Sequence, residues 1–364
     1  MVKRAIVRAF CLRIVLLNTL FFLCCLFGPA PLYAQTCPFS KCHIQLGGAS
    51  KYDASLKWWL KTPDCDATKW VVLYPDPPNT DNQRLLSASL TADGTPASGA
   101  SIRELSPYQR AVLMINFDAN DQTRHSIATF GHYSIALAPR QLVPGAGPEL
   151  GSPLAAGDRQ LYLSSSGLLD YRSSSFQHWL QSEELLRRAN ESDMDFAWRV
   201  FSKIRALYVY NYDSAQDRHA SQLCSTNRTD CGGLSIMFAS TLRNSGIPAR
   251  TLFGRHTTSD KAPGDVRTTY GAAHVISEFY QPEVGWIPVE MSGAVSRKDA
   301  DPLRFFGRDP GNLVTLHYDT DLQVDTILFG QSLVEYLQCP TFWVRGHGTT
   351  DNWSAQILWQ ITKN

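Results

Sequence analysis

The sequence predicts an α+β fold in which a β-rich region is followed by a region of helices and strands. Residues 35–138 contain short apolar or alternating runs separated by turn-forming clusters, a pattern typical of strands in a small β-sandwich or barrel. Residues 161–330 begin with apolar residues at helical spacing and continue with further strand-like runs. The Pro- and Gly-rich stretch 139–160 between them predicts a connector between two domains.

The amino terminus has the pattern of a secretory signal peptide, residues 1–34. Basic residues between Lys3 and Arg13 precede an apolar run over 14–27, and small residues lead to Ala34. The apolar run is shorter than the roughly 20 residues of a spanning helix, which makes a membrane anchor the weaker alternative. We therefore expect a periplasmic or secreted protein with no stable membrane insertion after processing.

The composition argues against nucleic-acid binding. The formal net charge of the whole chain is +1, and the basic residues of the expected signal peptide contribute more than this, so the remaining chain is slightly acidic. The sequence has no basic stripe of the kind that follows a phosphate backbone. With 44% hydrophobic residues, the chain can bury a sizeable core.

Export makes disulfides the expected use of most cysteines. Three of the nine cysteines lie in the expected signal peptide, and the others are Cys37, Cys42, Cys65, Cys224, Cys231 and Cys339. If Cys231 stays a thiol, at most two disulfides can form. Cys37 could close a small loop with Cys42, or either of them could pair with Cys65. A zinc site is the alternative, but the sequence has no Cys-x-x-Cys pair, so we expect no metal and no other cofactor.

A helix is predicted to begin at Cys231. Its apolar stripe follows helical spacing and consists of Leu234, Met237, Phe238, Thr241 and Leu242. Asp230 or Thr229 can cap its start, and Gly246 and Pro248 are stop signals. The free backbone N–H groups and the positive end of the helix dipole would then favour a thiolate. Cys231 is therefore the candidate nucleophile.

Two glycines, Gly232 and Gly233, follow this cysteine although glycine is a poor helix former. They would either let a substrate backbone approach the sulfur or permit close packing of the helix against a neighbour. The sequence leaves both explanations open.

A hairpin downstream supplies a base and an acid. Strands are predicted over 273–280 and 286–290, joined by a turn. In this hairpin His274 and Glu290 have the same parity, so they lie on one face, either directly opposite or diagonal. Glu290 could accept a hydrogen bond from one imidazole nitrogen and leave the other for Cys231. A thiol, an imidazole and a carboxylate are the groups that nucleophilic cysteine catalysis requires.

Five motifs in this order resemble the transglutaminase-like superfamily, and its exported bacterial members most. They are Asp230-Cys231-Gly232-Gly233, Gly246-Ile247-Pro248-Ala249-Arg250, Ala273-His274-Val275, Gly285-Trp286-Ile287-Pro288-Val289 and Arg304-Phe305-Phe306-Gly307. The resemblance covers residues 161–324. It implies a papain-like core in which the cysteine helix packs against an antiparallel sheet that bears the histidine and the acid. A β-rich extension is expected over 331–364.

The resemblance places the family's catalytic cysteine at Cys231 and its histidine at His274. The family's acid is usually aspartate, and Glu290 occupies its place with one extra methylene. A displacement on the ångström scale can cost about a hundredfold in rate. The identity of the acid therefore bears directly on activity.

These residues predict a cysteine-dependent enzyme that transfers an acyl group from an amide or peptide bond through a thioester. The substrate would be a protein or peptide, and hydrolysis is favoured over crosslinking because the resemblance includes many hydrolases. The alternative is a non-catalytic binding module at the cell envelope, for which Glu290 in place of aspartate is the best argument. A third hypothesis makes the N-terminal domain a polysaccharide or protein binder.

Overall fold

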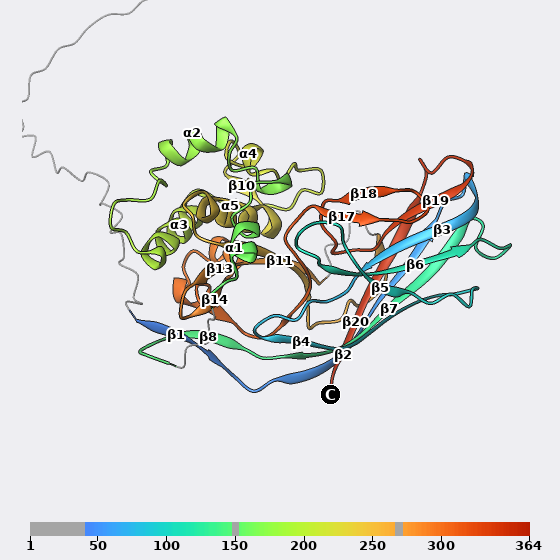
Figure 1. Ribbon diagram of the computed structural model, residues 1–364, viewed down its shortest axis with the longest axis horizontal. Coiled ribbons are helices and arrows are strands. Elements are labelled where there is room, and N and C mark those ends of the chain that lie inside the picture. Colours follow the sequence, from blue (N-terminus) through green and yellow to red (C-terminus); the bar gives the residue numbers. More distant parts are fainter. Residues whose placement is uncertain (1–40, 148–152, 266–271) are drawn as a thin grey trace, which may run out of the picture. The chain divides into compact units, whose positions relative to one another are not determined.

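Two antiparallel sheets form the β-sandwich that the N-terminal sequence predicts (Figure 1). The structure, a computed structural model, describes residues 41–147, 153–265 and 272–364. One sheet has the order β12-β20-β2-β7-β4 and the other the order β19-β3-β6-β5. The first consists of β12 (Gly264–Asp265), β20 (Ser354–Lys363), β2 (Ser50–Lys61), β7 (Ser126–Leu137) and β4 (Gln83–Ala92). The second consists of β19 (Thr341–Gly348), β3 (Cys65–Pro75), β6 (Ala111–Asp118) and β5 (Ala100–Arg103).

The core of this sandwich follows from strand alternation. Along β2 and β7 the buried side chains alternate with more exposed ones, as expected where one face of a sheet meets a core. Trp58, Trp70 and Trp359 belong to this core, and each is at most 1% exposed. The tryptophans are therefore packing residues.

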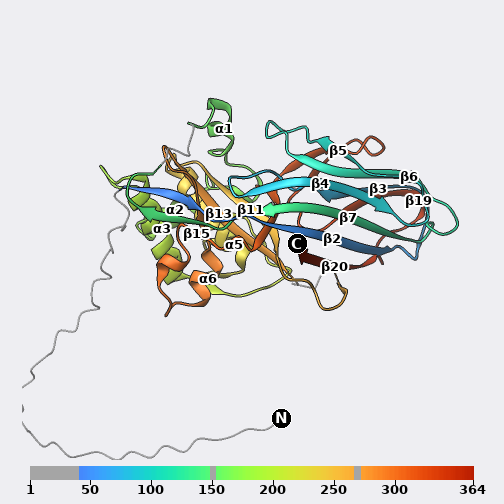
Figure 2. The same cartoon turned by 90° about the horizontal axis from the view of Figure 1, so that it is seen from below.

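The C-terminal extension, 331–364, contributes β19 and β20 to the two sheets and does not form a part of its own. β20 pairs with β2 over ten residues, and β19 pairs with β3. Figure 2 shows β20 running beside β2. Both β2 and β3 are interior strands, so each needs a hydrogen-bonding neighbour on both edges, and the extension supplies one for each.

The first part of the expected connector, 139–160, is a strand, which corrects the sequence-based expectation. β8 (Arg140–Pro144) lies between β1 (Cys42–Leu46) and β15 (Arg308–Asp309). The physical reason is Arg140, which is 1% exposed and forms ion pairs with Glu278 and Asp309. A buried guanidinium must be paired, so this segment is anchored. Helix α1 (Ala156–Leu161) follows, and residues 148–152 lie outside the described part.

A second antiparallel sheet with helices against it forms the remaining core. Its strand order is β14-β13-β11-β16. The strands are β14 (Gly285–Val289), β13 (Ala273–Gln281), β11 (Ala249–His256) and β16 (Leu313–Tyr318). The helices are α2 (Ser174–Ser182), α3 (Asp193–Leu207), α4 (Ala220–Leu223), α5 (Cys231–Asn244) and α6 (Met291–Ser296). Short elements complete the chain: η1 (Gly167–Leu169), β9 (Val209–Tyr210), β10 (Arg228–Thr229), η2 (Pro302–Arg304), β17 (Leu322–Asp325) and β18 (Gln331–Val334).

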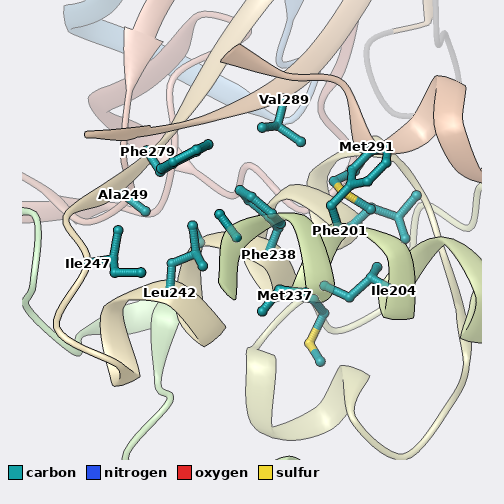
Figure 3. Packing of buried hydrophobic residues seen from close by; sticks show 14 of the residues in the cluster. Phe201, Ile204, Met237, Phe238, Leu242, Ile247, Ala249, Phe279, Val289 and Met291 are labelled. Carbon is teal, nitrogen blue, oxygen red and sulfur yellow. The ribbon is translucent and has the colours of Figure 1, made fainter. Parts of the chain in front are cut away.

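Helix α5 is the centre of this core. Every residue from Cys231 to Arg243 is buried. Figure 3 shows Phe238 and Leu242 of α5 beside Phe279 of β13 and Ala249 of β11. The rings of Phe238 and Phe279 lie 6.3 Å apart. The predicted arrangement, a cysteine helix on an antiparallel sheet, is confirmed.

Two sequence-based expectations concern residues outside this description. The signal peptide, 1–34, and Cys37 lie outside the described residues. Among the described helices, none is long and apolar enough to cross a membrane. No disulfide joins the cysteines that the structure describes, which are Cys42, Cys65, Cys224, Cys231 and Cys339. Cys42 and Cys65 lie on different sheets, in β1 and β3, so a bridge between them does not form.

Candidate active site

The start of α5 fixes the position of Cys231. Asp230 caps the helix, with its carboxylate accepting a hydrogen bond from the Gly233 N–H at 3.1 Å. The same carboxylate forms an ion pair with Arg218 at 2.5 Å. Cys231 is the first helical residue and is 5% exposed. The predicted cap and helix start are both confirmed.

The two glycines behind the cysteine have different surroundings. A Cβ on Gly233 would overlap the side chain of Thr229 and lie 3.0 Å from Leu223 Cδ1. A Cβ on Gly232 would have no neighbour closer than 3.4 Å. Close packing therefore explains Gly233, and there is space beside Gly232.

The hairpin brings His274 and Glu290 together. Ser277 lies opposite Val289 in the β13–β14 register, so His274 and Glu290 are diagonal neighbours, one of the two predicted arrangements. The distance from His274 Nε2 to Glu290 Oε2 is 2.5 Å. The backbone N–H of Glu290 donates to the carbonyl oxygen of Phe305 at 2.8 Å. This bond holds the end of β14 in place.

Glu290 has a second task as the cap of α6. Its Oε1 accepts hydrogen bonds from the Ser292 N–H at 3.0 Å, the Ser292 hydroxyl at 2.8 Å and the Gly293 N–H at 3.1 Å. One carboxylate oxygen is therefore fixed by the helix, and the other faces His274. A glutamate spans both sets of partners, which gives its extra methylene a structural use.

The charges of this pair reinforce each other. Burial would raise the pKa of Glu290, but the positive charge of His274 and the hydrogen bonds to the carboxylate lower it to about 2. Burial would lower the pKa of His274, but the negative charge of Glu290 and a hydrogen bond with Cys231 raise it to about 10. His274 is therefore an imidazolium at neutral pH. Because Nε2 faces Glu290, Nδ1 is the nitrogen left for the sulfur.

Aromatic side chains surround the sulfur. Cys231, Phe253 and Val275 form one cluster, and Tyr210 and Tyr336 pack against it. The rings of Phe253 and Tyr336 are stacked, 5.3 Å apart and 6° from parallel. Tyr336 comes from the C-terminal extension, in the segment between β18 and β19. The extension therefore contributes to the site as well as to the sandwich.

Two further residues contact His274, and sequence reasoning missed both. The amide of Gln338 donates to the carbonyl oxygens of His274 at 2.8 Å and Gly254 at 2.9 Å. The ring of His256 stacks on that of His274, with centroids 4.6 Å apart. Burial, followed by the positive charge on His274, lowers the pKa of His256. Pairing of β11 with β13 could have located His256, but no local signal marks Gln338.

A cavity of about 530 Å³ opens beside this group. His274, Glu290, His256 and Tyr210 line one part of it. Tyr210 also packs against Cys231, so the cavity extends to a neighbour of the sulfur. No group of three or more His, Cys, Asp or Glu side chains that could hold a metal ion occurs in the described ranges.

A helix-borne cysteine against a sheet-borne histidine and acid is the papain-like arrangement, and comparison with known families agrees. Residues 182–291 match the family model of the transglutaminase-like superfamily, so the chain contains a transglutaminase-like domain. Cys231, His274 and Glu290 all lie within the matched range.

The fold is similar to that of solved structures at low sequence identity. The "Putative Cysteine Protease from Cytophaga hutchinsonii" has a TM-score of 0.55 and 10% identity, covering 88% of this chain and 92% of that chain. The periplasmic domain of TgpA from Pseudomonas aeruginosa has a TM-score of 0.38 and 15% identity, covering 72% of this chain and 76% of that chain. No curated protein sequence matches the chain. The α+β fold with a transglutaminase-like core and an N-terminal sheet-rich region is therefore established.

Proposed function

We propose that this protein is an exported cysteine-dependent enzyme that hydrolyses amide or peptide bonds through a thioester, with Cys231, His274 and Glu290 as its catalytic residues. One observation carries the proposal: His274 is held between the carboxylate of Glu290 and the sulfur of Cys231. An imidazolium beside a thiol at a helix start favours the thiolate, which is the reactive form.

The first half of the reaction forms the thioester. The Cys231 thiolate attacks the carbonyl carbon, and the backbone N–H of Cys231, which has no acceptor within the helix, can donate to the developing oxyanion. The imidazolium of His274 gives a proton to the leaving amine as the C–N bond breaks. Glu290 keeps the ring oriented and stabilises its charge, as the acid of a triad does.

The second half returns the enzyme to its starting state. His274, now neutral, takes a proton from water, and the hydroxide adds to the thioester carbonyl. The C–S bond breaks, releasing a carboxylic acid and restoring the thiolate beside the imidazolium. The charge of the cavity supports water as the acceptor, because Arg297, Arg304 and Arg308 line it and would repel the ammonium of a lysine.

Thiol alkylation tests the proposed nucleophile. Treatment of the protein with iodoacetamide between pH 5 and 9, followed by peptide mapping, should modify Cys231 first and already at the acid end of the series. Cys224 is the internal control, because burial raises the pKa of its thiol and it should react only at alkaline pH. Uniform slow modification of all cysteines would remove the basis of the proposal.

The alternative, a non-catalytic binding module, is favoured by the cover over the sulfur. Cys231 is 5% exposed, and Tyr210 and Tyr336 pack on its cluster. Peptide turnover that disappears in Cys231→Ser decides for the enzyme. Peptide binding that is equal in both proteins, without turnover in either, decides for the module.

A further inference from the structure

Three arginines line the cavity beside His274 and have no use in the reaction described above. They are Arg297, Arg304 and Arg308, and all three are exposed. Across the described ranges, no carboxylate forms an ion pair with any of their guanidinium groups. The cavity therefore carries three uncompensated positive charges on one wall.

The two carboxylates in the same cavity do not balance these charges. Glu290 is occupied by His274 and by the first turn of α6. Asp309 is buried and accepts hydrogen bonds from the Asn82 amide at 2.9 Å, the Arg140 Nε–H at 3.3 Å and the Gly311 N–H at 2.8 Å. Both acids are thus neutralised by groups outside the arginine wall. The local potential in the cavity is positive, and a concave surface concentrates such a field.

The arginines are also held at a fixed place relative to the candidate acid. Arg304 precedes Phe305, whose carbonyl oxygen accepts the backbone hydrogen bond of Glu290 at 2.8 Å. Arg308 follows Gly307, whose N–H donates to the carbonyl oxygen of Pro288 at 2.8 Å.

Arg297 ends the helix that Glu290 caps, and its guanidinium lies 4.8 Å above the ring of Phe305. All three side chains are therefore attached to backbone that is bonded to the site itself. A loose surface patch would lack this connection.

From this geometry we propose that the cavity is a carboxylate-binding subsite, and that the enzyme prefers peptides with a carboxylate close to the bond to be broken. The proposal rests on the proposed function, since it names the substrate class of that site. Guanidinium groups bind carboxylates through paired, charge-assisted hydrogen bonds, and arginine is better suited to this than lysine. The cavity volume lies in the range of known ligand sites.

Such a carboxylate has two sources in a peptide, an acidic side chain or a free C-terminus, and the test separates them. Peptide substrates are compared in matched pairs: glutamate against glutamine at each position around the bond, and a free against an amidated C-terminus. The expected result is a kcat/KM about tenfold to a hundredfold higher for one of the charged members. The pair that shows the difference identifies the source.

Variants connect the preference to the arginines. Arg304→Gln and Arg308→Gln should each reduce the preference several-fold, mainly through KM, and Arg304→Glu should reverse it toward lysine-containing peptides. Arg84→Gln is the matched control, because Arg84 is exposed on β4 and distant in the fold from this cavity. Equal kcat/KM for charged and neutral peptides, with turnover that still requires Cys231, overturns the subsite and leaves the proposed function intact.

Binding measured without chemistry separates the two proposals. Fluorescence anisotropy of labelled peptides on Cys231→Ser should show tighter binding of the carboxylate member, whether or not the wild-type protein turns it over. A binding preference without any turnover would support the subsite and reject the enzyme. Equal binding of the charged and neutral peptides would reject the subsite.

Discussion

Two groups of buried charges share one sheet, and they are built in different ways. Glu278 of β13 is fully buried between Arg140 and Arg250, with a carboxylate oxygen for each. On the same face of β13, His274 faces Glu290, whose side chain is 24% exposed. Every charge in the Glu278 group is satisfied internally. The His274 group leaves one imidazole nitrogen toward a sulfur and opens into a cavity.

The difference teaches what each group is for. A closed set of buried ion pairs offers no free donor to a ligand, so its effect is on folding and on the junction of strands β8, β11, β13 and β15. An incomplete set keeps a proton where a reacting group can take it. Breaking the first should therefore unfold the protein, and breaking the second should inactivate a folded protein.

The largest expected effect is on the open pair. Glu290→Gln should lower kcat by a factor on the order of 10² to 10⁴, because an amide cannot stabilise the imidazolium. Glu290→Asp should retain more activity, since it keeps the charge and can still cap α6. Both are measured as peptide turnover, with circular dichroism to show that the fold is kept. Equal activity of the wild type and Glu290→Gln would contradict the triad.

The closed group should respond in stability. Glu278→Gln leaves Arg140 and Arg250 buried with only partial compensation, which should cost about 3 kcal/mol or more of unfolding free energy. Urea unfolding measures this change. Asp118→Asn is the control, because its partner Lys69 is on the surface and the pair contributes at most about 1 kcal/mol. Similar losses in both variants would show that the Glu278 group is not a special junction.

The smallest effect is the dependence of stability on pH. The pKa of His274 is raised from 6.5 to about 10, so its contribution is complete below pH 6.5 and disappears as the pH rises through 10. The pKa of Glu290 is lowered from 4.5 to about 2, so its contribution is complete above pH 4.5 and disappears on acidification through 2. The stability difference between wild type and Glu290→Gln should thus be greatest between pH 4.5 and 6.5. A difference that grows between pH 7 and 10 would contradict the assigned charges.

The parts that were predictable are those with local signals. Helix α5 has its cap, its apolar stripe and its stop signal within twenty residues, and the hairpin register follows from parity around one turn. The contributions of Tyr336 and Gln338 depend on chain segments that are distant in sequence, and no local pattern encodes such pairing. The anchoring of Arg140 was missed for the same reason. A Pro- and Gly-rich stretch looks like a connector until its buried partners are known.

The placement of β19 and β20 has a consequence for the order of folding. β2 is made early in synthesis, but one of its two neighbours is β20, so the sandwich stays open until residues 354–363 have been made. Pairings of this sequence separation form slowly. Tyr336 and Gln338 immediately precede β19, so the wall around Cys231 closes only when the same late strands arrive. The thiol would thus acquire its complete surroundings at the end of folding, and the growing chain would be protected from its own chemistry by its topology.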